Sequence, residues 1–256
     1  MTNDFTGVTE APGINVSNEA LRMVYHRYQT SGLYCQGKDV LEVACGAGMG
    51  LGYLARKAKS LVGADYTDYL IKQARGHYAG RLPLLRLDAA LLPFKEGAFD
   101  VVVCCEAIYY FPNAARFLEE CRRVLRPGGA VLISTVNREW SAFNPSSLST
   151  KYYSSAELKV LLQDNGFRAE IYGAFPTQNS SRKDAAVSLI KRAAVSLGVI
   201  PKTMKGKEWL KRFFLGKLTM LPAELNGGEP AYVKPIFLDA SAPIGSYKII
   251  YAVGWH

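Results

Sequence analysis

The sequence predicts an α/β fold built on a doubly wound, mostly parallel sheet of seven strands. Short apolar segments alternate with helical stretches as far as about residue 135, a pattern typical of a parallel sheet with helices on both faces. A mainly apolar run at 40–43 leads into a glycine-rich turn at 44–50, as expected where a strand feeds a helix. A last apolar segment, 247–253, has the right length for a final antiparallel strand.

Each element follows from a local pattern in the chain. Residues 1–15 are polar, contain Pro12-Gly13 and are expected to form a loose arm. Ser17 then opens a helix towards Thr30, because apolar side chains recur behind it at helical spacing. Ser154 opens another helix, which ends at Asn165-Gly166. The remaining predicted elements are a helix at 51–59 and strands at 40–43, 61–65, 82–87, 99–105, 130–135, 167–172 and 247–253.

Length and composition favour one domain over 1–256, with an N-terminal arm and capping helix at 1–36 and an insert at 174–246. The five cysteines are not spaced as metal ligands and there are only three histidines, so we expect buried reduced thiols and no metal. The sequence contains no 18-residue apolar run and no secretion signal, which predicts a soluble, cytoplasmic protein.

The glycine-rich turn predicts a nucleotide-like ligand above the end of the first strand. Gly46, Gly48 and Gly50 would let the backbone approach such a ligand, and the next helix would aim its amide groups at it. Dehydrogenases, kinases and ordinary tight turns share this feature. Asp65 ends the second strand 17 residues beyond Gly48, where a carboxylate can grip a ribose. An acid at a strand end is also a common helix N-cap.

Five motifs in order carry a resemblance to a known family. The chain resembles class I S-adenosylmethionine-dependent methyltransferases of the broad quinone and small-molecule type, over roughly residues 20–175 and the last ten. This resemblance implies a seven-stranded Rossmann-like sheet and S-adenosylmethionine as cofactor. The motifs are Leu41-Glu42-x-Ala44-Cys45-Gly46-x-Gly48, Asp65, Asp88-Ala89 before Leu92-Pro93-Phe94, Phe99-Asp100-Val101-Val102, and Arg123-Val124-Leu125-Arg126-Pro127-Gly128-Gly129.

The resemblance also implies a set of cofactor contacts. Glu42 and the glycine turn would hold the methionine end and the sugar, Asp65 the ribose hydroxyls and Asp88 the adenine amino group. Two departures are mild: Glu42 stands where aspartate is commoner, and Ala44 stands where the first glycine is usual. The implied cofactor-binding residues are Tyr25, Arg27, Glu42, Ala44, Gly46, Gly48, Asp65, Tyr66, Asp88, Ala89, Cys105 and Glu106.

Three residues are candidates for work on the acceptor. His26 lies in the N-terminal helix, which folds over the cofactor in similar enzymes, so it is a candidate base; a lone helical histidine is also often structural. Tyr109 and Tyr110 follow the fourth strand, where similar enzymes place residues that face the transferred methyl group. Two adjacent aromatic residues there equally fit core packing.

Most of the net charge of +9 lies in the insert. Residues 182–217 hold ten basic side chains and two acidic ones, with apolar stripes at helical spacing. Those stripes fit packing on the sheet, a lid over an acidic substrate, or a helix on an anionic membrane surface. Nucleic acid is not the expected partner, because no dedicated RNA-binding module accompanies the aromatics.

The function predicted from the sequence is therefore methyl transfer from S-adenosylmethionine to a small molecule or a sugar or glycan precursor. Oxygen is the expected acceptor atom, with in-line displacement as the mechanism. The first alternative is methylation of a prenylated quinone or lipid, with the insert as a peripheral membrane contact. The second is a non-catalytic cofactor-binding subunit that presents the insert to RNA or an acidic partner. The sequence predicts neither the acceptor nor the oligomeric state.

Overall fold

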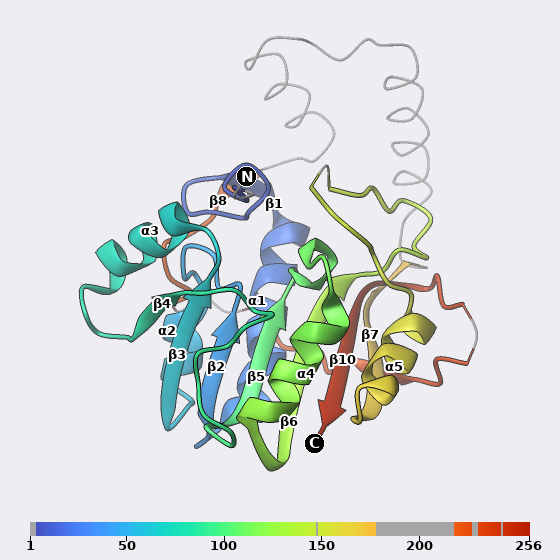
Figure 1. Ribbon diagram of the computed structural model, residues 1–256. Coiled ribbons are helices and arrows are strands. Elements are labelled where there is room, and N and C mark those ends of the chain that lie inside the picture. The colour runs from blue at the N-terminus through green and yellow to red at the C-terminus, as the bar shows by residue number, and fades with distance from the viewer. Residues whose placement is uncertain (1–3, 147, 178–217, 227–229, 242) are drawn as a thin grey trace.

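The computed structural model describes residues 4–146, 148–177, 218–226, 230–241 and 243–256. Its core is a sheet of eight described strands with the order β4-β3-β2-β5-β6-β10-β7-β9 (Figure 1). The strand bounds are β2 Asp39–Val43, β3 Ser60–Asp65, β4 Leu84–Arg86, β5 Phe99–Cys105, β6 Leu125–Val136, β7 Arg168–Pro176, β9 Ile236–Leu238 and β10 Tyr247–Trp255.

Five described α-helices cover the two faces of this sheet. One face packs against α4 (Ala114–Val124) and α5 (Ser155–Asp164), and the other against α1 (Asn18–Cys35), α2 (Leu51–Ala55) and α3 (Asp68–Tyr78). Side chains of β2 alternate between the faces, because successive residues of a strand point to opposite sides: Leu41 joins the α4 side and Val40 the α1 side. Both faces are therefore buried, as a parallel sheet requires.

The predicted doubly wound, mostly parallel sheet is confirmed. β4, β3, β2, β5 and β6 are parallel neighbours, and β10 is inserted between β6 and β7, antiparallel to both. The edge strand β9 was not predicted; it pairs antiparallel with β7 and brings the described strands of this sheet to eight. β9 lies within the insert, and three residues of an edge strand carry no periodicity that marks them in the sequence.

Several predicted boundaries are wrong by a few residues. The helix predicted at 51–59 ends at Ala55 and continues as a turn, in which the Lys57 amide donates to the Leu54 carbonyl at 3.0 Å. The strand predicted from Leu82 begins at Leu84, after Pro83, which cannot donate a ladder hydrogen bond. β6 begins at Leu125 instead of residue 130, since Leu125 already pairs with Phe99 of β5. The helices expected within 182–217 lie outside the described residues.

Both helices predicted from capping residues begin where expected. The Ser17 hydroxyl accepts a hydrogen bond from the Ala20 amide at 3.1 Å, and α1 then continues past Thr30 to Cys35. At α5, Ser154 and Glu157 form a reciprocal capping box.

The N-terminal arm is ordered where the structure describes it. Residues 4–14 form turns, and β1 (Asn15–Ser17) pairs antiparallel with β8 (Leu218–Met220) as a separate two-stranded ribbon. In Figure 1 this ribbon lies above the ends of the parallel strands, beside the start of α1. The expectation of a loose arm at 1–15 is therefore wrong for the described part, because β8, a distant segment of the insert, supplies the pairing partner.

Candidate active site

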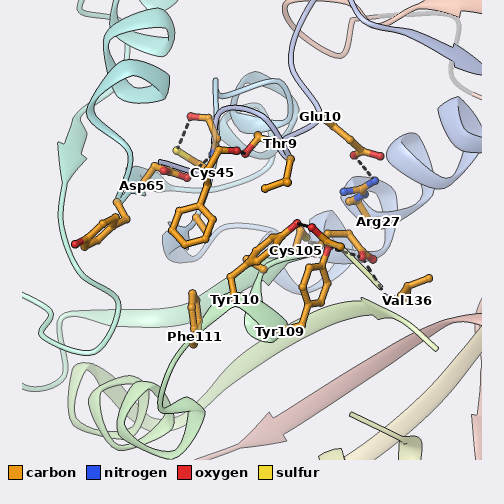
Figure 2. A pocket seen from close by; sticks show the side chains of 18 of the residues that line it. Thr9, Glu10, Arg27, Cys45, Asp65, Cys105, Tyr109, Tyr110, Phe111 and Val136 are labelled. Carbon is orange, nitrogen blue, oxygen red and sulfur yellow. Dashed lines mark hydrogen bonds and ion pairs between the residues drawn. The ribbon is translucent and has the colours of Figure 1, made fainter. Parts of the chain in front are cut away.

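A cavity of about 720 Å³ lies at the carboxyl ends of β2, β3, β4 and β5. β2 pairs with β3 on one side and β5 on the other, so the chain order reverses there, and open α/β sheets bind ligands at such a point. The volume is typical of small-molecule sites, which span roughly 300–1,000 Å³. Figure 2 shows Asp65 and Cys45 on one side of the cavity, Arg27 on another, and Tyr109 and Tyr110 along a third.

The turn after β2 brings the backbone to the cavity wall. Gly46 lines the cavity with φ +59°, and a Cβ atom added to it would lie 3.0 Å from the Thr9 methyl group. Ala44 also lines the cavity, with φ +54°, a left-handed conformation that an L-residue adopts at a cost. The structure thus places both predicted residues at the site, and Ala44 carries backbone strain that a glycine would not.

The other two glycines of the turn do not give room to a ligand. A Cβ on Gly48 would lie 2.9 Å from the Tyr78 ring, and one on Gly50 would lie 1.9 Å from the Tyr28 ring. Neither glycine lines the cavity. The prediction that Gly48 contacts the cofactor is therefore not supported, because its missing side chain makes space for protein packing. The amides of the short helix α2 are not aimed at a ligand either, since the Gly52 amide donates to the Tyr78 hydroxyl.

Replacing Ala44 with glycine should stabilise the protein. Ala44→Gly removes the left-handed strain, and we expect the free energy of unfolding to rise by about 0.5–1 kcal/mol, because the greater freedom of glycine in the unfolded chain offsets part of the gain. Urea unfolding monitored by circular dichroism measures the change. Ala79→Gly is the matched control, since Ala79 has φ +46° at the exposed end of α3, far from the cavity. A loss of stability in Ala44→Gly alone would contradict the strain at this turn.

Asp65 connects the glycine turn to the end of β3. One carboxylate oxygen accepts the Gly46 amide at 2.8 Å, and the other accepts the Thr67 amide at 2.8 Å, just before α3. The side chain is buried, which raises its pKa, although the amide hydrogen bonds oppose that shift. Asp65 therefore combines the two roles weighed from the sequence: it satisfies a helix-start amide and it presents a carboxylate to the cavity.

Asp88 and Ala89 line the far end of the cavity, after β4. Asp88 is exposed, and one of its oxygens accepts the Ala90 amide at 2.8 Å. Tyr66 also lines this end, and its ring lies 6.4 Å from the ring of Phe5 in the N-terminal arm. This end therefore combines an open carboxylate with a wall of aromatic side chains.

Glu42 lies next to the cavity wall without lining it. Its Oε1 accepts the Tyr28 hydroxyl at 3.0 Å, and its Oε2 has no hydrogen-bond partner among the described residues. Complete burial raises the pKa of Glu42 to about 7, against the opposing effects of Tyr28 and Arg27. A buried carboxylate oxygen normally accepts a hydrogen bond from a polar group or a water molecule. The predicted direct contact with the cofactor is not what the structure shows here.

Arg27 forms the charged centre of the cavity. Its guanidinium pairs with Glu10 at 2.6 Å, and Figure 2 shows the two side chains facing each other across the cavity wall. Burial opposes the charge of Arg27, but the carboxylates of Glu10 and Glu106 outweigh burial and raise its pKa. Cys105 and Glu106 form the floor at the end of β5, as predicted.

Tyr109 and Tyr110 both line the cavity, in a short 3-10 helix at Ile108–Tyr110 after β5. The Tyr109 ring stacks on Tyr152 with centroids 4.2 Å apart, and its hydroxyl donates to Glu106 at 3.3 Å. The Tyr110 hydroxyl donates to the Ser146 hydroxyl at 3.1 Å. The structure therefore places both residues at the site, and core packing alone does not account for them.

His26 does not reach the cavity. Val233 offers a carbonyl oxygen 2.7 Å from Nε2, so Nε2 carries the proton and Nδ1 accepts the Tyr251 hydroxyl at 2.7 Å. Burial lowers the pKa of His26 and keeps the ring neutral. The prediction that His26 is the base in contact with the acceptor is wrong, because α1 turns this side chain towards the Val233 segment. Tyr25, also a residue of α1, is buried in the core and does not line the cavity.

Comparisons with known proteins agree with this geometry. Residues 41–133 match the family model described as a methyltransferase domain. The chain is 36% identical over 171 residues to a probable S-adenosylmethionine-dependent methyltransferase of Mycolicibacterium smegmatis, covering 64% of this chain and 65% of that protein. It is 40% identical over 143 residues to phthiotriol/phenolphthiotriol dimycocerosates methyltransferase 1 of Mycobacterium ulcerans, covering 50% and 51%. Residues 41–133 therefore form a methyltransferase domain, and the chain is similar to class I S-adenosylmethionine-dependent methyltransferases in sequence and fold.

Solved structures show the same fold. A SAM-dependent methyltransferase from Archaeoglobus fulgidus superposes with a TM-score of 0.57 and 16% identity, over 91% of this chain and 93% of that one. One from Aquifex aeolicus gives a TM-score of 0.52 and 21% identity, over 59% and 84%. The matches to the curated relatives named above span about half to two thirds of those proteins, 51% and 65% of their lengths.

The residues of this methyltransferase domain fit S-adenosylmethionine. The cavity holds a left-handed glycine at the turn, a carboxylate after β3 and a second carboxylate after β4, in the order that the adenosine part of the cofactor requires. Asp65 would hold the ribose and Asp88 the adenine, while Arg27 offers a positive charge for the methionine carboxylate. The bound cofactor supplies a methyl group that its sulfonium already activates.

Three segments that line the methyltransferase cavity were not predicted from the sequence. The N-terminal arm contributes four residues, the segment between β6 and α5 contributes four, and β10 contributes two. No motif signals them, because each reaches the cavity only through tertiary packing; the single local clue is the run of proline and serine after β6. The residues are Phe5, Val8, Thr9, Glu10, Asn144, Pro145, Ser146, Tyr152, Ile249 and Tyr251.

Proposed function

We propose that this methyltransferase transfers the methyl group of S-adenosylmethionine to a hydroxyl oxygen of an acceptor whose body is largely apolar. The observation that carries the proposal is the apolar composition of the cavity wall on the side of Arg27 away from Asp65 and Asp88. The wall there combines Val8, Met23, Val136 and Ile249 with aromatic rings. Pockets of this kind bind apolar bodies and use a few polar groups to orient them.

The chain's own residues would then act mainly by placement. The cavity must hold the acceptor oxygen in line with the reacting methyl group at about 3 Å, and such positioning supplies much of the rate acceleration. The ring centroids of Phe5 and Tyr110 lie 5.2 Å apart, so the N-terminal arm forms part of the cavity wall and would help to exclude water. Tyr109 and Tyr152 form a stacked wall along the acceptor path.

A lipid acceptor is the first choice within this class. The relative named for dimycocerosates is a methyltransferase of a lipid, and the apolar wall of the cavity fits a lipid better than a sugar. A sugar or other polar small molecule is the second candidate, because Asn144 and Ser146 add hydrogen-bonding groups to one side of the cavity.

Label partitioning tests the proposal. Purified protein is incubated with methyl-labelled S-adenosylmethionine and a bacterial extract, and the label is separated into organic, polar and RNA fractions. We expect the label in the organic phase, and far less of it when the Asp65→Ala variant replaces the wild-type protein. Label in the polar fraction would favour the sugar-type acceptor. Label in RNA, or no transfer at all, would contradict the proposed function.

Membrane contact through residues 182–217 is a further prediction of the sequence, on a segment outside the described residues. With ten basic side chains against two acidic ones, this segment should hold the protein on anionic vesicles at low salt. We expect cosedimentation with phosphatidylserine vesicles that disappears at about 1 M salt, where the screening length is roughly 3 Å. A deletion of 182–217 should abolish it. Equal retention on neutral vesicles would contradict an electrostatic contact.

Among the described residues, none of the helices has the length and apolar character of a membrane-spanning segment.

A further inference from the structure

Methylation of a hydroxyl requires a group that takes up the hydroxyl proton. Few side chains in the described cavity wall can act as such a base. Neither histidine nor lysine is found among the described residues that line it, so a carboxylate is the natural proton acceptor. Four carboxylates line the cavity. Asp65 and Asp88 belong to the nucleoside end, and Glu10 is paired with Arg27 at 2.6 Å. Glu106 is the remaining carboxylate, at the end of β5.

The geometry of Glu106 suits this role. Its backbone has φ +52°, a strained conformation for a residue with a side chain, and such strain is concentrated at functional sites. Both of its hydrogen bonds end on Oε2, from the Val136 amide at 3.2 Å and the Tyr109 hydroxyl at 3.3 Å. Oε1 accepts no hydrogen bond from the described residues. One carboxylate oxygen is thus fixed while the other is available in the cavity.

The electrostatic setting agrees with the geometry. Burial raises the pKa of Glu106, which favours proton uptake, and the charge of Arg27 opposes this shift. Tyr109 is itself held in place, because its carbonyl accepts the Thr150 amide at 2.7 Å and its ring stacks on Tyr152. A carboxylate held by a rigid tyrosine can meet an acceptor hydroxyl in a reproducible orientation.

We infer that Glu106 is the catalytic base that receives the proton of the acceptor hydroxyl, an inference that rests on the proposed function. The acceptor oxygen forms its bond to the methyl carbon as the carbon–sulfur bond breaks and its electron pair stays on sulfur. The hydroxyl proton moves to Oε1 of Glu106 and later leaves to solvent. The products are the methyl ether and the neutral thioether, so charge and atoms balance.

The test compares two acceptors that differ in the need for a base. A long-chain 4-alkylphenol is un-ionised at neutral pH, whereas its 2,6-dinitro analogue is almost fully ionised and needs no proton acceptor. For Glu106→Gln we expect the rate on the alkylphenol to fall by about 100-fold to 10,000-fold, with the dinitrophenol within a few-fold of wild type. Glu106→Asp, which keeps the carboxylate, should restore part of the alkylphenol rate. Glu96→Gln, an exposed site far from the cavity, is the control.

Binding of S-adenosylhomocysteine, measured by calorimetry, distinguishes a lost base from a lost cofactor contact in Glu106→Gln. We expect Glu106→Gln to keep the wild-type affinity, because glutamine still accepts both hydrogen bonds. Equal loss on both phenols with intact binding would overturn the base role, and lost binding would make Glu106 a cofactor ligand instead. A wild-type protein that methylates neither phenol nor any hydroxyl lipid would overturn the proposed function, and the inference with it.

Discussion

Asp65→Ala should weaken the binding of S-adenosylhomocysteine by about 100-fold or more, equivalent to about 3 kcal/mol, because charge-assisted hydrogen bonds contribute roughly 1.5–3 kcal/mol each. The carboxylate that would hold the ribose also accepts the amides of Gly46 and Thr67. Its loss therefore removes a ligand contact and loosens the turn that shapes the cavity. Isothermal titration calorimetry on the purified variant measures the affinity.

A neighbouring acid provides the matched control. Asp68 is half exposed at the start of α3 and pairs with Lys72 at 2.7 Å, outside the cavity. We expect Asp68→Ala to bind with nearly wild-type affinity. If folded Asp65→Ala retained that affinity as well, the ribose would not lie at the end of β3 and the assignment of this end of the cavity would be wrong.

Stability of the cofactor-free protein should decline as the pH rises from about 4.5 to 7 through the effect of Glu42. Its pKa is about 7 in the folded state, against 4.5 for an exposed glutamate. In this window the unfolded chain has released the proton while the folded protein still holds it, so the unfolded state binds fewer protons and the free energy of unfolding falls. The gap corresponds to about 3 kcal/mol.

The variant Glu42→Gln isolates this effect from other titrating groups. The difference in free energy of unfolding between Glu42→Gln and wild type should grow in favour of the variant by about 3 kcal/mol between pH 4.5 and pH 8. Urea unfolding across this range measures it. Glu96→Gln, at an exposed site, is the control for the substitution itself. A flat difference for Glu42→Gln would mean that its carboxylate is not desolvated as the structure shows.

The parts of the fold that repeat a local pattern were predictable from the sequence. β2, β3 and β5 alternate buried residues between helix-covered faces, and Ser154 with Glu157 marks the start of α5. β9 was not predictable, because three residues of an edge strand carry no periodicity of their own. The pairing of β1 with β8 joins segments about 200 residues apart, and only the folded chain brings them together.

The candidate site divides in the same way. Gly46, Asp65 and Asp88 lie at strand ends, where the order of the elements fixes their place, so the sequence was sufficient to predict them at the cavity. Side-chain direction was not predictable. His26 and Arg27 are adjacent in α1, yet Arg27 lines the cavity while His26 contacts Val233 on another side. The cavity-lining residues of the N-terminal arm have no sequence motif, because they reach the cavity only when the folded arm packs against Tyr66 and Tyr110.

A crystal structure of the protein with S-adenosylhomocysteine tests the central claim most directly. The ribose hydroxyls should lie within hydrogen-bonding distance of Asp65 and the adenine beside Asp88 and Ala89. The sulfur should face the side of the cavity that holds Glu106 and Tyr109. A ligand bound outside this cavity, or bound with its adenine against Tyr109, would contradict the account.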